Sequence, residues 1–334
     1  MIYKNVLEAI GYTPIIELQK MVGEDSARVL VKYEGLNVGG SIKTRTALNM
    51  ILAAEEAGIL KPDSIIVEPT SGNQGIGLAL VGAVKGYETV IIMPDSVSEE
   101  RRLLVEHYGA KVVLIHDAGN IGDCIDECVK TALRMKEENP RVYVPQQFEN
   151  QANPMVHRHH TGLEILEQVA GPIDGFCSGI GTGGTITGIG ETLKALNPQI
   201  TIWAVEPENA AILAGGTVGN HIQMGIGDGV IPTVLNQCIY EDIAIISDEE
   251  ALHTAMPRQR AAPLRVCPAW LIAIYLQASK SLLYLSYFSN RFFNPRFCIS
   301  DFRLYIPIRE EIVKNIIRKG CKRVDLNLNI HHFI

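Results

Sequence analysis

A lysine at the start of a predicted helix is the first residue of this sequence whose position could do chemistry. Segment 39–43 leads from a β-rich run into a helical pattern, and Ser41 is a suitable N-cap residue. Lys43 then lies in the first helical turn, where the positive end of the helix macrodipole lowers the pKa of an amine. A lysine that forms an imine requires such a lowered pKa. The alternative is an exposed, solvated lysine.

A second turn between a predicted strand and a predicted helix presents backbone N–H groups to an anion. It contains Thr70, Ser71, Gly72 and Asn73, and the amide of Asn73 can donate a hydrogen bond to a ligand. The alternative is an ordinary strand–helix turn with a capping residue.

The glycine-rich turn 179–188 precedes another predicted helix, and its consecutive N–H groups could form a phosphate cradle. The residues expected to form the cradle are Gly181, Thr182, Gly183, Gly184 and Thr185. The letters Gly-x-Gly-x-x-Gly also occur here, but a dinucleotide site would place them in the first βαβ unit of the chain. The late position and the two threonine hydroxyls favour a single phosphate.

Three further features bear on a site. Gln147 follows a predicted strand at the junction of two α/β groups, so its amide could enter a cleft. Loop 224–232 is rich in glycine, and Gly225 lies where we expect a close approach to a ligand. No metal site is expected, because no cysteine or carboxylate stands at metal spacing beside the three neighbouring histidines His157, His159 and His160.

Alternating strands and helices position these residues. Residues 1–255 show a βαβα rhythm, which is typical of parallel sheets covered by helices. The expected strands are 29–33, 64–67, 89–93, 111–115, 142–144, 175–177, 200–205 and 243–246. The expected helices are 41–57, 75–85, 98–108, 122–138, 154–169 and 185–196, with a capping box at 247–250. We predict an α/β fold with two lobes and a cofactor cleft between them: a smaller lobe over 37–149, and a larger one formed by 1–36 and 150–255.

Composition and charge exclude several classes of protein. Hydrophobic residues are 47% and charged residues 20% of the chain, which is typical of a soluble globular protein and not of a disordered one. The net charge of −7 gives no electrostatic footprint for nucleic acid. The longest clean apolar run near the C-terminus is 269–276, where a membrane span needs about 20 residues. Seven scattered cysteines and the absence of an N-terminal signal peptide predict a cytoplasmic protein.

The C-terminal part differs from the rest of the chain. Residues 256–334 contain 1 of the 30 glycines, 13 of the 30 Lys and Arg, and only 4 of the 37 Asp and Glu. Their net charge is +9, against −16 for residues 1–255. The capping box begins a helix, and Pro257 would end that helix within about two turns. We therefore treat 256–334 as an atypical basic, aromatic-rich tail.

Taken together, the motifs of residues 1–255 resemble those of the cysteine synthase (O-acetylserine sulfhydrylase) family of fold-type-II pyridoxal-phosphate enzymes. The resemblance is specific because the motifs occur jointly and in this order: 11–14, 39–43, 69–73, 147–148, 181–185 and 225–232. It implies a tryptophan synthase β-like fold, pyridoxal 5'-phosphate as cofactor, and a homodimer. The chain departs from the family pattern at Val38, Thr44 and Gln74, where proline, aspartate and threonine are common.

The resemblance also implies a role for each site residue. Lys43 would hold the cofactor as a Schiff base and later serve as the acid and base. Asn73 would bind the cofactor ring hydroxyl, and the cradle 181–185 its phosphate. The loop at Gly225 would close over the substrate. The residues implied to hold the carboxylate of the amino-acid substrate are Thr70, Ser71, Gly72 and Gln147.

The implied reaction is a β-replacement in which sulfide replaces the acetate of O-acetylserine and gives L-cysteine. The partners are then small-molecule substrates, with neither nucleic acid nor membrane. Within the class, the alternative is a cystathionine β-synthase-like enzyme that starts from serine. A dehydrogenase is disfavoured by the position of the glycine-rich turn.

The C-terminus is the main departure from the family pattern. After residue 255 the family continues its helix and then has a Gly-x-Ser-Ser-Gly turn whose serine faces the pyridine nitrogen, and nothing in 256–334 matches that turn. One hypothesis is that 256–334 is translated from a shifted reading frame, and a genuine basic module is the alternative. The larger lobe would then lack a central strand and expose a sheet edge. A catalytically dead, truncated member of the family is the corresponding alternative function.

Overall fold

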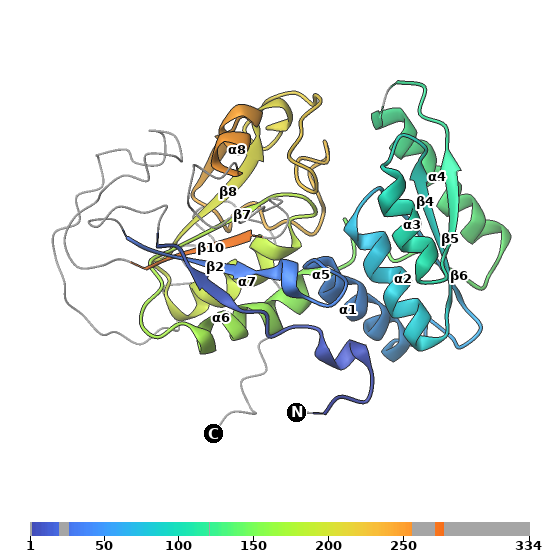
Figure 1. The fold of residues 1–334 in the computed structure, drawn as a ribbon, viewed down its shortest axis with the longest axis horizontal. Helices are drawn as coiled ribbons and strands as arrows, with labels where there is room; N and C mark the ends of the chain where they lie inside the picture. Colours follow the sequence, from blue (N-terminus) through green and yellow to red (C-terminus); the bar gives the residue numbers. More distant parts are fainter. Residues whose placement is uncertain (1, 20–26, 120, 256–270, 277–334) are drawn as a thin grey trace. The chain divides into compact units, whose positions relative to one another are not determined.

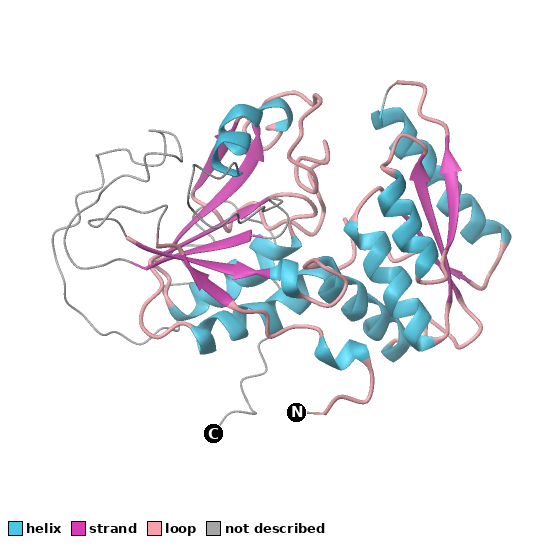
Figure 2. Ribbon diagram, viewed as in Figure 1, coloured by secondary structure: helices cyan, strands magenta, loops and turns pink. Residues whose placement is uncertain are grey.

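The described strands belong to two sheets, one of six strands and one of four (Figures 1 and 2). The computed structural model describes residues 2–19, 27–119, 121–255 and 271–276. Along the chain, helices alternate with strands, so the predicted α/β class is confirmed. Most of the predicted tail, and with it the reading-frame hypothesis, lies outside the described residues.

The four-stranded sheet is parallel throughout, as predicted. Its order is β5 (Lys111–Ile115), β4 (Glu88–Pro94), β3 (Ile65–Pro69) and β6 (Val142–Tyr143). The helices of this part of the chain are α1 (Lys43–Glu56), α2 (Asn73–Lys85), α3 (Glu99–His107) and α4 (Ile121–Glu138).

Both faces of this sheet are covered, which is why its strands are nearly continuous apolar runs. Successive side chains of β3 point to opposite faces. Ile66 therefore packs in a cluster with residues of α1 and α2, such as Ala47 and Leu78. Val67 packs in a second cluster with Cys128 of α4.

The six-stranded sheet is only partly parallel. Its order is β1 (Ile15–Glu17), β2 (Arg28–Tyr33), β10 (Leu271–Leu276), β7 (Gly175–Gly179), β8 (Thr201–Pro207) and β9 (Asp242–Ile246). Strands β7, β8 and β9 are parallel, whereas β10 runs antiparallel to both β2 and β7, and β1 antiparallel to β2. The predicted parallel pairing is thus present from β7 to β9, whereas the pairings of β1, β2 and β10 are antiparallel.

Strand β10 changes one expectation about the tail. We expected the larger lobe to lack a central strand and to expose an edge of its sheet. In the structure, residues 271–276 pair with β2 on one side and with β7 on the other (Figure 1). Within the described sheet, the facing edges of β2 and β7 are therefore both paired, by β10.

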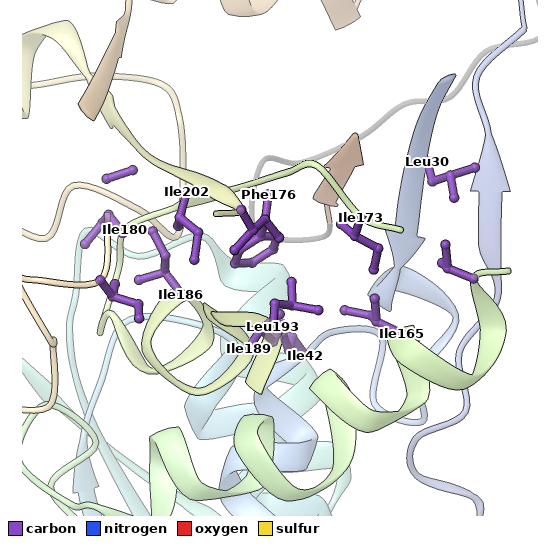
Figure 3. Packing of buried hydrophobic residues seen from close by; sticks show 14 of the residues in the cluster. Leu30, Ile42, Ile165, Ile173, Phe176, Ile180, Ile186, Ile189, Leu193 and Ile202 are labelled. Carbon is purple, nitrogen blue, oxygen red and sulfur yellow. The ribbon is translucent and has the colours of Figure 1, made fainter. Parts of the chain in front are cut away.

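The core of the six-stranded sheet lies between its strands and the helices α6 (Gly162–Gln168) and α7 (Gly184–Leu196). Phe176 and Ile202 of neighbouring strands pack with Ile186 and Ile189 of α7 (Figure 3). Ile165 of α6 joins the same cluster and is fully buried. This packing fixes α7, whose N-terminus carries the predicted phosphate cradle.

The helix expected over 154–169 is interrupted. It consists of α5 (Ala152–Val156), a π-helical turn (His157–Thr161) and α6. The buried His157 ring lies between two hydroxyls, with Nδ1 3.1 Å from Thr161 Oγ1 and Nε2 3.4 Å from Thr46 Oγ1. A single wide turn shifts the apolar periodicity too little to be visible in the sequence, which is why the pattern predicted one regular helix.

Two predicted helix starts can be compared with the structure. The capping box is confirmed: Ser247 Oγ accepts the N–H of Glu250, and Glu250 Oε2 accepts the N–H of Ser247, before α8 (Asp248–Ala255). The N-cap of α1 is Ile42 and not Ser41, although Ser41 Oγ still accepts the N–H of Lys43 at 3.3 Å. Short 3-10 turns cover Val6–Ala9, Glu34–Leu36 and Glu208–Ala210.

Within the described ranges, no helix has the length and apolar composition that a membrane crossing requires.

Candidate active site

Three helix N-termini carry the predicted site residues. Lys43 is the first residue of α1, Asn73 of α2 and Gly184 of α7. Helix α2 follows β3 and α7 follows β7, so two of these starts lie at the carboxyl ends of parallel strands, where α/β folds bind ligands. None of the three first turns contains an acidic residue, so their N–H groups can serve an anionic ligand.

The amine of Lys43 lies in a partly buried environment. Burial lowers the pKa of Lys43, and the negative charge of Asp228 opposes this effect. Burial in turn raises the pKa of the Asp228 carboxyl, and the positive charge of Lys43 lowers it. The lowered pKa makes the free amine easier to form than in water, which an imine-forming lysine requires.

The turn before α7 passes too close to its neighbours for side chains on its glycines. A Cβ atom on Gly181 would lie 2.7 Å from the carbonyl oxygen of Gly225, and one on Gly184 would collide with Oδ1 of Asn153. Gly183 has a φ of +76°, which a residue with a side chain rarely adopts. The bare backbone at this helix N-terminus fits a phosphate group.

Hydrogen bonds connect this cradle to the predicted carboxylate-binding residues. Gln147 Nε2 donates to Thr70 Oγ1 at 3.4 Å. Asn153 Nδ2 donates to the carbonyl oxygen of Gln147 at 2.8 Å and to Thr182 Oγ1 at 2.9 Å. The structure therefore brings Thr70, Gln147 and the cradle together, although they are far apart in the sequence.

Backbone hydrogen bonds fix the loop before α2, and the side-chain amide of Asn73 makes none of them. The carbonyl oxygen of Ser71 accepts a hydrogen bond from Arg101 Nη1 at 3.2 Å, and the Gly72 N–H donates to Thr70 Oγ1 at 3.3 Å. Among the described residues, the Asn73 side chain has no hydrogen-bond partner, and it is only partly buried. Among the described residues, no hydrogen bond joins Asn73 directly to Lys43, the first residue of α1.

Sequence reasoning missed several residues that build this site. Asn153 links Gln147 to the cradle, Asp228 faces Lys43 electrostatically, and Glu68 accepts the N–H groups of Gln146 and Gln147. The only sequence signal for Glu68 and Asn153 was their position: Glu68 directly precedes the 69–73 motif, and Asn153 directly precedes a predicted helix. Their partners lie too far along the chain for a pattern to reveal them.

Two departures from the family pattern leave unpaired groups beside the site. Thr44 and Gln74 are almost completely buried, with 0% and 1% of their surface exposed. The Thr44 hydroxyl and both polar atoms of the Gln74 amide have no hydrogen-bond partner in the structure. These side chains directly follow Lys43 and Asn73, so the departures lie in the second residue of α1 and of α2.

His157 is the buried member of the three neighbouring histidines, and His159 and His160 are exposed. Burial strongly lowers the pKa of His157, and the positive charges of Arg45 and Lys43 lower it further, so the ring is neutral. Across the described parts of the chain, no group of three or more His, Cys, Asp or Glu could hold a metal ion.

Comparisons with known proteins agree with this geometry. The family model of pyridoxal-phosphate dependent enzymes matches residues 6–263. The chain is 44% identical over 256 residues to a probable cysteine synthase from Bacillus subtilis (strain 168), covering 76% of this chain and 81% of that protein. It is 47% identical over 249 residues to a cysteine synthase from Staphylococcus aureus (strain Mu50), covering 74% and 79%.

A solved structure supports the same relationship. The crystal structure of a cysteine synthase from Entamoeba histolytica matches with a TM-score of 0.71 and 37% identity, covering 76% of this chain and 75% of that one. The family match, the identities and the shared fold confirm the resemblance inferred from the motifs. The chain therefore belongs to the family of pyridoxal-phosphate dependent enzymes.

Proposed function

We propose that this chain is a cysteine synthase that replaces the acetate of O-acetylserine with sulfide and releases L-cysteine. The observation that carries the proposal is a phosphate cradle joined by hydrogen bonds to an amide–hydroxyl pair. A lysine with a lowered pKa at another helix N-terminus supports it. The relatives that bear the name cysteine synthase support it.

The cradle and Asn73 would hold the cofactor. The N–H groups at the start of α7, with the hydroxyls of Thr182 and Thr185, would bind the phosphate of pyridoxal 5'-phosphate. The free amide of Asn73 would donate to the ring hydroxyl. When bound, pyridoxal phosphate supplies an electron sink for charge that develops at the substrate Cα.

Lys43 would anchor the cofactor and move the proton. Its Nζ would bond covalently to the cofactor in the resting protein and would later remove the α-proton of the substrate. Burial favours both roles, because the free amine is the nucleophile and the base.

The amino-acid substrate would bind through its carboxylate. Thr70, Ser71 and Gly72 present hydroxyl and N–H donors, and Gln147 places its amide 3.4 Å from the Thr70 hydroxyl. The loop at Gly225, which lies against Gly181, would close over the bound substrate.

Cofactor loading is the direct test. Purified protein with added pyridoxal phosphate should absorb visible light, and borohydride should then fix the cofactor on a peptide that contains Lys43. Lys43→Ala should abolish the covalent label, whereas Lys61→Ala, at an exposed lysine outside the site, should leave it unchanged. A folded, colourless protein that borohydride cannot label would contradict the proposal.

The substrates distinguish the two enzymes of this class. We expect O-acetylserine to change the visible spectrum of the loaded protein, and sulfide to restore it with release of cysteine. Turnover of serine with homocysteine, without turnover of O-acetylserine with sulfide, would assign the cystathionine β-synthase-like reaction instead.

The protein is also proposed to act as a homodimer in the cytoplasm, with lobes at 37–149 and at 1–36 plus 150–255. The odd number of cysteines and their scattered spacing in the sequence support a reducing compartment. Sedimentation equilibrium should give twice the monomer mass.

The coding DNA tests the tail: another frame starting near codon 256 should encode a Gly-x-Ser-Ser-Gly turn if the reading frame is shifted.

A further inference from the structure

A buried carboxylate lies directly behind the proposed carboxylate-binding residues. Glu68, near the end of β3, is 1% exposed. Its Oε2 accepts the N–H of Gln146 at 3.0 Å, and its Oε1 accepts the N–H of Gln147 at 3.1 Å. One side chain thus binds two consecutive N–H groups of a turn 78 residues further along the chain.

The turn that Glu68 binds has an unfavourable backbone. Gln146 has a φ of +58°, in the left-handed region that glycine or asparagine normally occupies. Such a conformation persists only where surrounding contacts determine it. The two hydrogen bonds from Glu68 supply contacts of this kind, together with the bonds that the Gln146 carbonyl oxygen accepts from Glu149 and Asn150.

This turn determines where the Gln147 side chain begins. With its N–H held by Glu68 and its carbonyl oxygen held by Asn153, the Gln147 backbone is fixed on both sides. Its side-chain amide then reaches Thr70, one of the residues proposed to bind substrate. Glu68 itself makes no hydrogen bond to the cradle or to Lys43 among the described residues, so it acts through Gln147.

We propose that Glu68 is a positioning residue that holds the Gln147 amide in place for the α-carboxylate of the amino-acid substrate. The inference rests on the proposed function, because it assumes that Gln147 binds that carboxylate. It predicts that loss of the Glu68 charge weakens binding of ligands that carry an α-carboxylate and spares ligands that lack one.

The charge of Glu68 is sensitive to pH near neutrality. Burial raises the pKa of Glu68 to about 7, against the two backbone hydrogen bonds, which lower it. Tyr143 on β6 interacts with it electrostatically, and no basic side chain among the described residues shifts the Glu68 pKa. Protonation below about pH 7 turns one acceptor oxygen into a hydroxyl, which loosens the grip on the turn.

The test is ligand binding to the cofactor-loaded protein by calorimetry. The probes are L-serine, which carries an α-carboxylate, and L-serinamide, which does not. Glu68→Gln should raise the Kd for L-serine about tenfold at about pH 8, and the Kd for L-serinamide by less than about twofold. At about pH 6 the Kd values of the variant and the wild type should converge, because protonated Glu68 resembles glutamine.

Two variants control for a merely structural effect. Glu206, near the end of β8, is also buried and also accepts two consecutive N–H groups, from Leu213 and Ala214. Glu206→Gln should change the L-serine affinity much less. Glu68→Asp, which keeps the charge, should restore part of the lost affinity, and it decides the matter if Glu68→Gln does not fold.

Several outcomes would overturn the inference. Equal losses for L-serine and L-serinamide, or a wild-type Kd for L-serine in Glu68→Gln at both pH values, would show that Glu68 does not position Gln147. Adding Glu68→Gln to Gln147→Ala should have no further effect on L-serine binding, and a full additional loss would also contradict it. Failure of the wild-type protein to take up pyridoxal phosphate would instead overturn the proposed function.

Discussion

Two adjacent residues in the first turn of α1, Thr44 and Arg45, differ in whether their buried polar groups have hydrogen-bond partners. Arg45 faces a cluster of buried charges in which every group is paired. It donates to both oxygens of Glu34 at 2.8 and 3.0 Å and to both oxygens of Glu164 at 2.5 and 2.7 Å. Lys32 also lies 2.7 Å from Glu164 and donates to the Thr13 carbonyl oxygen.

The adjacent residue has no such partners. Thr44 is fully buried and unpaired, and Gln74 at the start of α2 is unpaired at both polar atoms. An unpaired buried polar group costs about 1–3 kcal/mol of stability, whereas a satisfied one is roughly neutral or favourable. The Arg45 side therefore anchors α1 to the 3-10 turn Glu34–Leu36 and to α6, whereas the Thr44 side is locally less stable.

The strongest way to break this contrast is to remove Arg45. Arg45→Met should lower the free energy of unfolding by about 3–5 kcal/mol, because Glu34 and Glu164 are left as buried charges without their partner. Urea denaturation followed by circular dichroism measures this loss. Arg28→Met is the matched control, since its ion pair with Glu17 is exposed and should be worth less than about 1 kcal/mol.

Acid should test the paired side in a second way. Burial alone would raise the pKa of Glu164, but the hydrogen bonds and charges of Arg45 and Lys32 lower it to about 2, from 4.5 in an unfolded chain. The ionised form is therefore favoured in the folded protein, and its contribution is complete above pH 4.5 and is lost as the pH falls toward about 2.

Comparison with Glu164→Gln isolates this contribution from other carboxylates. The difference in unfolding free energy between wild type and variant should be largest above pH 4.5 and should shrink on acidification. A difference that stays constant from neutral pH down to about pH 2.5 would show that Glu164 has an ordinary pKa.

The smallest expected effect comes from the unpaired side and has the opposite sign. Gln74→Met keeps the length of the side chain and removes two unpaired buried atoms, so it should raise the free energy of unfolding by about 1 kcal/mol. Gln199→Met, at an exposed position, should change stability by less than about 0.5 kcal/mol. A clear destabilisation by Gln74→Met would mean that the amide has a partner, such as a buried water, and would weaken the contrast.

The glutamates near the strand ends show how one local device serves two purposes. Strands β3 and β8 both end in Val-Glu-Pro, and each glutamate binds two successive N–H groups of a distant loop. On β8 the bound loop includes Leu213, which packs against the hydrophobic core. On β3 the bound loop includes Gln147, a polar side chain that reaches the site.

Much of the fold was predictable because its signals are local. Parallel strands buried on both faces are apolar runs, and β4 was expected over 89–93 and found at Glu88–Pro94. Helix starts depend on a few neighbouring residues, so the capping box before α8 was found where it was predicted. Lys43, Asn73 and Gly184 were identified for the same reason, because anion-binding helix N-termini are marked by nearby glycines and small hydroxyl residues.

The sequence by itself determined the order of strands and helices, the family and the residues at the three helix starts, because these depend on neighbours along the chain. Only the tertiary structure decided which distant groups meet. It inserted 271–276 between β2 and β7, and joined Glu68 to the turn at Gln147. It also left Gln74 without a partner. Hydrogen bonds form between atoms within about 3.5 Å whatever their separation in sequence, so no local pattern can specify them.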